Sequence, residues 1–120
     1  MNHDRAFKLV SCLFAMAAMY HALAVVLPGL GIPGARGRHT LFVVISAACS
    51  RLLVRRPLWF LPAYALLTVQ QVYSHGWGAW LSWTVEHRVD WLALAVVVIV
   101  PLTLVLLASE AREHAGRRAA

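Results

Sequence analysis

The side chains of this chain that could do chemistry gather near the ends of its apolar segments. The sequence has 6 histidines, and imidazole is the side chain best suited to proton transfer and metal binding near neutral pH. Four of them fall where we expect one membrane face: His21, His39, His75 and His87. The stretch QQVYSHGWGAWLSW at 70–83 adds amides, a hydroxyl and indoles around His75. These residue types predict a binding site at this face, but they do not name a reaction.

The composition identifies the class of protein that must position these residues. Only 13% of the residues are charged and 61% are hydrophobic, whereas a soluble domain carries about 25% charged residues. The net charge of +6 does not indicate nucleic-acid binding, because the Lys and Arg residues form short clusters between apolar segments instead of one basic face. Such clusters orient membrane proteins.

Four apolar segments predict an all-α integral membrane four-helix bundle. We expect spans at approximately 7–28, 40–56, 58–75 and 89–109, since a span needs about 20 residues to cross about 30 Å. The second segment is the weakest span, because Arg51 interrupts it and has to reach the interface. A short or tilted helix packed between the other three is the alternative. A cleaved signal peptide is the alternative for the first segment, although its apolar run is long for one.

The basic residues predict the orientation of these spans. One side of the membrane would receive Arg5, Lys8, Arg51, Arg55, Arg56, Arg112, Arg117 and Arg118. The other side would receive only Arg36, Arg38 and Arg88. The positive-inside rule therefore places both termini in the cytoplasm, as expected for a protein of the bacterial inner membrane. We expect a single membrane domain over 1–120, in which 110–120 is a fraying helix end and solvated tail.

Two helical stripes predict how the spans face one another. The third segment carries polar residues at helical spacing, namely Tyr64, Thr68, Gln71 and His75. We expect this stripe to face the interior of the bundle, either lining a site or bonding to another helix. The first segment carries small residues at the same spacing, namely Ser11, Ala15, Ala18 and Ala22. Small residues in line predict close helix packing, with His21 beside that seam.

The tryptophans predict where the chain meets the membrane interface. Trp77, Trp80, Trp83 and Trp91 lie where the chain leaves and re-enters the bilayer, and indole rings prefer that depth. We expect residues 76–87 to form a short interfacial helix, with ligand stacking as the alternative role of the indoles. Glu86 and Asp90 either complement a helix N-terminus or orient His87.

The segment 27–39 brings basic groups to the same face. Its glycines match GxGxxG, but no strand precedes them and Pro33 lies within the motif, so a dinucleotide site is not expected. The segment leads to Arg36, Arg38 and His39, which could hold a propionate, a carboxylate or a lipid phosphate. Ordinary anchoring at the interface is the alternative for these arginines.

The function expected first is binding of a cofactor or small amphipathic ligand: haem, a metal or a quinone. The candidate residues are His21, His39, Gln71, His75, Tyr64, Arg36 and Arg38. For haem b, which needs two histidines at similar depth, His39 with His75 matches better than His21 with His75, because His21 should lie about one turn deeper. A weaker candidate is a copper or zinc site formed by His39, His75 and His87.

Two other functions stay open. In a quinone-linked oxidoreductase subunit, His21 or His75 would donate a proton while Gln71 and Tyr64 orient the head group. An accessory or structural subunit of a larger membrane complex would use the polar cluster to contact a partner. There is no GxSxG, HExxH or CxxC motif, so an enzyme acting alone is not expected. The expected partners are the lipid bilayer and other membrane subunits or a second copy of the chain.

Overall fold

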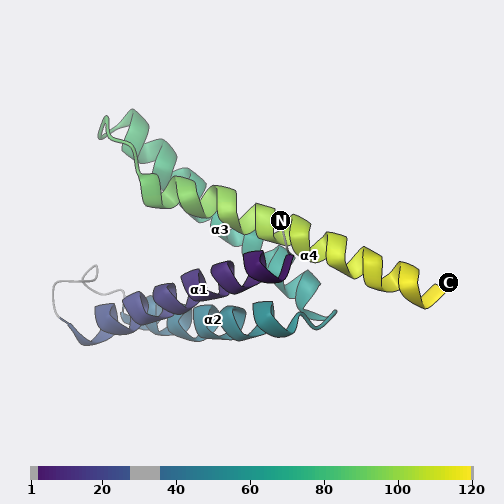
Figure 1. The fold of residues 1–120 in the computed structure, drawn as a ribbon. Coiled ribbons are helices and arrows are strands. Elements are labelled where there is room, and N and C mark those ends of the chain that lie inside the picture. Colours follow the sequence, from purple (N-terminus) through teal and green to yellow (C-terminus); the bar gives the residue numbers. More distant parts are fainter. Residues whose placement is uncertain (1–2, 28–35, 120) are drawn as a thin grey trace. The chain divides into compact units, whose positions relative to one another are not determined.

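The computed structural model of the chain is all-helical over residues 3–27 and 36–119, the part that it describes. The helices are α1 (His3–Val26), α2 (Arg36–Arg55), α3 (Phe60–Thr84) and α4 (Trp91–Ala119) (Figure 1). They form two compact units, Met1–Arg56 with α1 and α2, and Pro57–Ala120 with α3 and α4. The predicted all-α class with four helices is confirmed.

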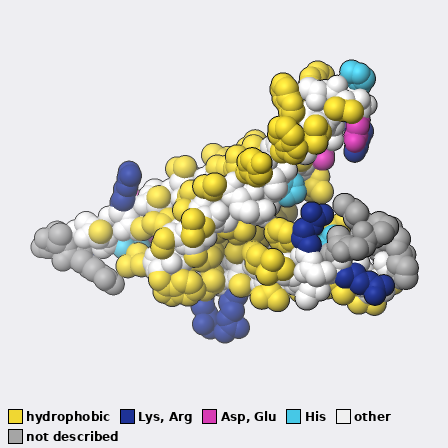
Figure 2. Space-filling view, turned by 180° about the vertical axis from the view of Figure 1, so that it is seen from behind, with side chains coloured by type: hydrophobic (Ala, Val, Ile, Leu, Met, Phe, Trp, Pro, Cys, Tyr) yellow, Lys and Arg dark blue, Asp and Glu magenta, His cyan; other side chains and the backbone are white. Residues whose placement is uncertain are grey.

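Three of the described helices are long and apolar enough to cross a membrane, which indicates a membrane protein. They are α1, α2 and α4, the last over Trp91–Arg117. Of these three, α2 has the lowest mean hydropathy, as expected for the weakest span, whereas α3, which was expected to be a clearer span, is not among them. Although α3 has 25 residues and no charged side chain, its amides, imidazole, indoles and glycines lower its mean hydropathy. Figure 2 shows hydrophobic side chains over much of the visible face, with charged groups confined to a few places.

In the first unit, α1 and α2 lie side by side as a helical hairpin (Figure 1). The buried residues of α2 are His39, Ser46, Cys49 and Leu53. They lie 7, 3 and 4 positions apart, which fits the heptad spacing of left-handed helix pairs. On the α1 side, the Ser11 hydroxyl donates a hydrogen bond to the Ser50 carbonyl oxygen at 2.7 Å and lies 3.1 Å from the Ser50 hydroxyl. This polar contact fixes the register of the two helices.

The predicted small-residue seam on α1 is wrong at Ala15, which is exposed. The covered face of α1 is instead the neighbouring stripe. Its residues are of mixed size, and all of them are buried or half-buried. They are Phe7, Ser11, Phe14, Ala18 and His21. Both stripes share Ser11 and Ala18, so residue size alone could not distinguish them. His21 therefore belongs to the packing face and does not lie beside it.

Arg56, the residue that follows α2, ends that helix and contacts the start of α1. Its φ of 48° is left-handed, and its N–H bonds to the carbonyl oxygen of Leu52 at 2.7 Å, which ends the helix. The guanidinium lies 2.8 Å from a carboxylate oxygen of Asp4 and 4.9 Å from the centre of the Phe7 ring. These ion-pair and cation–π contacts join the start of α1 to the end of α2.

In the second unit, α3 begins later and ends later than predicted. The Phe60 N–H bonds to the Pro57 carbonyl oxygen at 2.9 Å, so Pro57 lies in the preceding turn and not at the helix start. The helix then continues through Gly76 and Gly78 to Thr84. The expected separate interfacial helix is therefore the last part of α3. A Cβ at either glycine would meet nothing within 4 Å, so these glycines neither mark a turn nor a close approach.

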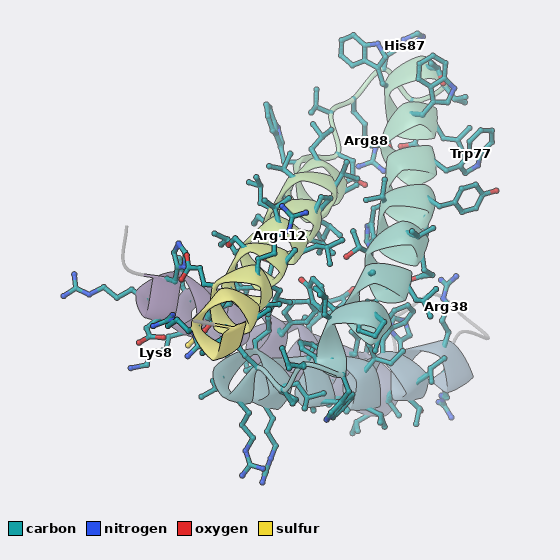
Figure 3. The ribbon with its side chains drawn as sticks, turned by 90° about the vertical axis from the view of Figure 1, so that its right-hand side faces the viewer. Lys8, Arg38, Trp77, His87, Arg88 and Arg112 are labelled. Atoms are coloured by element: carbon teal, nitrogen blue, oxygen red, sulfur yellow. The ribbon has the colours of Figure 1, made fainter. Side chains whose placement is uncertain are left out.

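The chain then turns and enters α4 (Figure 3). The Arg88 N–H bonds to the Ser82 carbonyl oxygen at 3.0 Å, and His87 takes a left-handed φ of 51°. Asp90 caps α4, because its carboxylate accepts a hydrogen bond from the Ala93 N–H at 2.9 Å. This supports the helix-terminus role that was one of the two expected for Asp90.

The C-terminal part of α4 is helical, which differs from the expected fraying end. The helix runs through Pro101 and continues to Ala119. Glu113 and Arg117 form an i, i+4 ion pair at 3.5 Å, and Glu110 lies 3.7 Å from His114. Such pairs favour helix in a polar segment, which explains why the exposed tail stays helical.

The tight contact at Ser11 yields a stability test. We expect Ser11→Leu to lower the free energy of unfolding by about 1–3 kcal/mol, because a larger side chain would overpack the contact with Ser50. Ala15→Leu, on the exposed neighbouring stripe, is the matched control and should leave stability unchanged. Reversible unfolding in mixed detergent micelles measures both. Equal stability of Ser11→Leu and wild type would contradict the packing described here.

Candidate binding site at the paired histidines

Two histidines from separate helices meet in the first unit. His21 Nδ1 on α1 lies 2.9 Å from His39 Nδ1 on α2, and the ring centroids are 5.2 Å apart. His39 reaches this depth because α2 begins at Arg36, four residues earlier than expected. His39 therefore lies about one turn inside the helix, level with His21, instead of at the helix start.

Aromatic rings surround the pair. The Phe42 ring stacks on His21 at 5.3 Å between centroids. Tyr20 contacts both imidazoles edge-on, at 5.3 Å from His21 and 6.4 Å from His39. Sequence analysis did not single out Tyr20 or Phe42. The only signal for them was position, since Tyr20 adjoins His21 and Phe42 lies three residues after His39.

The hydrogen bond between the imidazoles couples their tautomers. One Nδ1 must carry the proton while the other accepts it. If neutral His39 accepts at Nδ1, its Nε2 carries the hydrogen and can donate. If His39 donates from Nδ1, its Nε2 presents a lone pair. The location of one shared proton thus decides whether the far side of His39 is a hydrogen-bond donor or an acceptor.

The Nε2 atom of His39, on the side of the ring away from His21, is the strongest indication of a binding site. The residue is only 8% exposed, and its Nε2 is buried with no hydrogen-bond partner among the described residues. Leaving a buried polar atom unsatisfied costs about 1–3 kcal/mol, and most such atoms have a partner in folded proteins. A bound molecule that hydrogen-bonds to Nε2 would remove this cost.

The geometry does not support the expected metal or haem sites. Two nitrogens on one tetrahedral zinc ion, each about 2.0–2.1 Å from it, lie about 3.3 Å apart, so the 2.9 Å contact between Nδ1 atoms is a hydrogen bond. The described residues contain no group of three His, Cys, Asp or Glu side chains that could hold a metal ion. His39 belongs to the first unit, and His75 and His87 belong to the second.

Arg36 and Arg38 occupy the first turn of α2, on the same helix end as His39. Both are exposed, and Figure 3 shows Arg38 projecting from this end of the helix. The guanidinium groups add positive charge to the partial positive charge of the helix N-terminus. The predicted glycine loop before them, at 28–35, lies outside the described residues.

The polar stripe of α3 lies on the covered face of that helix, as its spacing indicates. Tyr64 and Thr68 are buried, and Gln71 and His75 are half-buried. Tyr64 packs against the Phe60 ring at 5.4 Å, and the Thr68 hydroxyl donates to the Tyr64 carbonyl oxygen at 2.8 Å. The Gln71 amide donates to the Gln70 side-chain oxygen at 2.8 Å. The Thr68 and Gln71 side chains thus bond within α3.

The remaining candidates lie on exposed surface of the second unit. His87 is exposed in the turn (Figure 3), and Glu86 pairs with Arg88 instead of with a histidine. The indoles expected to anchor the protein at the interface, Trp77, Trp80, Trp83 and Trp91, are all exposed. Exposed indoles are what interface anchoring requires.

Comparisons of the chain with protein-family models, with curated proteins and with solved structures gave no match.

The His21–His39 bond yields a spectroscopic test. For the neutral pair, we expect ¹⁵N NMR to show one protonated and one unprotonated Nδ1. Replacing His39 by Ala should shift the His21 Nδ1 resonance, because its partner is lost. His114→Ala is the control, since His114 is exposed on α4. Two unprotonated Nδ1 atoms in the wild type would show that the bond is absent.

Proposed function

We propose that this chain is a small polytopic membrane protein that binds an amphipathic small molecule at the His21–His39 pair. The single observation that supports this function best is the buried Nε2 of His39, which has no hydrogen-bond partner among residues 3–27 and 36–119. An imidazole nitrogen that is buried between apolar helices without a hydrogen bond destabilises the fold. A ligand head group that bonds to this nitrogen would remove that cost.

The surroundings favour a neutral, hydrogen-bond-accepting head group such as the carbonyl of a quinone. Charge is costly to bury in apolar and aromatic surroundings, and the imidazoles lie among Tyr20 and Phe42. Arg36 and Arg38 are exposed beyond the pair and add positive potential at its outer edge. An isoprenoid tail would stay in the bilayer, beside the apolar faces of α1 and α2.

In this proposal the two histidines have different roles. The Nε2–H of His39 donates to the ligand carbonyl, which requires Nδ1 of His39 to accept from the Nδ1–H of His21. His21 is thus a positioning residue, because it holds the tautomer of His39 that can donate.

We further propose that the chain crosses the membrane four times with both termini in the cytoplasm, which places the histidine pair near the outer face of a bacterial inner membrane. The support is the distribution of Lys and Arg along the sequence and the length of α3. A helix of 25 residues extends about 37 Å at 1.5 Å per residue, which exceeds the hydrocarbon thickness.

Ligand binding is tested with a short-chain ubiquinone titrated into the purified full chain in detergent, followed by calorimetry. We expect His39→Ala to weaken binding about tenfold, the effect of losing one hydrogen bond of about 1.4 kcal/mol. His21→Ala should weaken it less, because His39 keeps its Nε2. His114→Ala should not change the affinity.

Two results would contradict the binding proposal. One is that the wild-type chain binds no quinone in a preparation that unfolds cooperatively. The other is that His39→Ala binds as tightly as the wild type. Either result, combined with co-purification of a membrane partner, would favour the accessory-subunit function instead.

The topology is tested with reporter fusions after residues 34, 57, 87 and 120. We expect cytoplasmic activity at 57 and 120, because the clusters of arginine precede these two positions. We expect extracytoplasmic activity at 34 and 87. A C-terminal reporter on the extracytoplasmic side would mean an odd number of crossings and would exclude the proposed orientation.

A further inference from the structure

A second polar site lies at the other end of the α1–α2 hairpin. An open depression with a volume of about 650 Å³ is lined by one residue of α1 and five of α2, namely Ser11, Ala47, Ser50, Arg51, Val54 and Arg55. Arg51 is 12 residues beyond His39, which is about 18 Å along a helix at 1.5 Å per residue. The depression is therefore separate from the histidine pair.

Two cationic side chains on the same helix face border this depression. Arg51 and Arg55 are one turn apart and both exposed, and like charges at this spacing repel. Neither has an ion pair or a hydrogen bond among the described residues, whereas Arg56 pairs with Asp4 and Arg117 pairs with Glu113. Both guanidinium groups thus border the depression without a negative partner among the described residues.

Depth in the membrane indicates which anion fits. Arg51 lies within a helix that is apolar enough to span, and an arginine near the end of a span extends its guanidinium toward the interface. The anion present at that depth is the phosphate of a phospholipid. A guanidinium binds a phosphate through two parallel hydrogen bonds. Ala47 and Val54 give the same depression an apolar wall, against which the start of an acyl chain can lie.

We propose that Arg51 and Arg55 bind the phosphate head group of an anionic phospholipid in this depression. The paired hydroxyls of Ser11 and Ser50 form its polar floor. Zwitterionic phosphatidylcholine carries the same phosphate but a bulky cation beside it, which two arginines disfavour. The site therefore selects lipids by net negative charge.

The test is native mass spectrometry of the purified full chain, titrated with dioctanoyl phosphatidylglycerol, dioctanoyl phosphatidylcholine or inorganic phosphate. We expect the anionic lipid to bind most tightly. In the variant Arg51→Gln/Arg55→Gln its affinity should fall roughly thirtyfold, since each juxtamembrane arginine contributes about one kcal/mol. Arg112→Gln/Arg117→Gln, which removes the same charge from the solvated end of α4, should retain wild-type affinity.

A second variant separates loss of binding from loss of folding. Arg51→Lys/Arg55→Lys keeps both charges but cannot form bidentate bonds, so we expect an affinity between those of wild type and the glutamine variant. Equal binding of the two lipids would overturn the proposal. Inorganic phosphate binding as tightly as the anionic lipid would also overturn it, because the site would then recognise a free anion. An equal loss of affinity in the Arg112/Arg117 control would show that only net charge matters.

Discussion

Polar groups between apolar helices need partners from the protein, because hydrocarbon supplies none, and this constraint organises the α1–α2 hairpin. The Ser11 and Ser50 hydroxyls satisfy one another in one half of the hairpin, and Asp4 with Arg56 closes that end. In the other half, His21 and His39 satisfy one another at Nδ1. The exception is Nε2 of His39, which has no partner in the part of the chain that the structure describes. This atom distinguishes a site from ordinary helix packing.

The helical class and the number of helices could be predicted, because long uncharged apolar runs permit little else. The number of charged residues alone did not predict which of the segments have the highest hydropathy. The third segment has no charged residue but carries Gln70, Gln71 and His75, while the second keeps a run without Asp, Glu, Lys or Arg from His39 to Ser50. The end of α3 was missed for a local reason. Gly76 and Gly78 resemble a helix stop, yet the surrounding residues form helix and neither glycine needs a special conformation.

The candidate site was predicted only in part, and the reason is the position of one helix boundary. With α2 expected from Thr40, His39 was expected at the start of the helix, clustered with His21 and His75 at one membrane face but not paired with His21. The helix begins at Arg36, which draws His39 inward by about one turn and brings the two imidazoles together. The sequence does not show this, because the loop before α2 carries no clear N-cap. The pairing of Tyr20 and Phe42 with the histidines depends on helix rotation, which spacing within one helix cannot predict.

The measurement that tests the central claim most directly is a double-mutant cycle between His21 and His39. The free energy of unfolding is measured in mixed micelles for wild type, His21→Ala, His39→Ala and the double variant. We expect a coupling free energy of about 0.5–1.5 kcal/mol, the contribution of one hydrogen bond between partly buried groups. Additive effects of the two substitutions would contradict the paired site on which the proposed function rests.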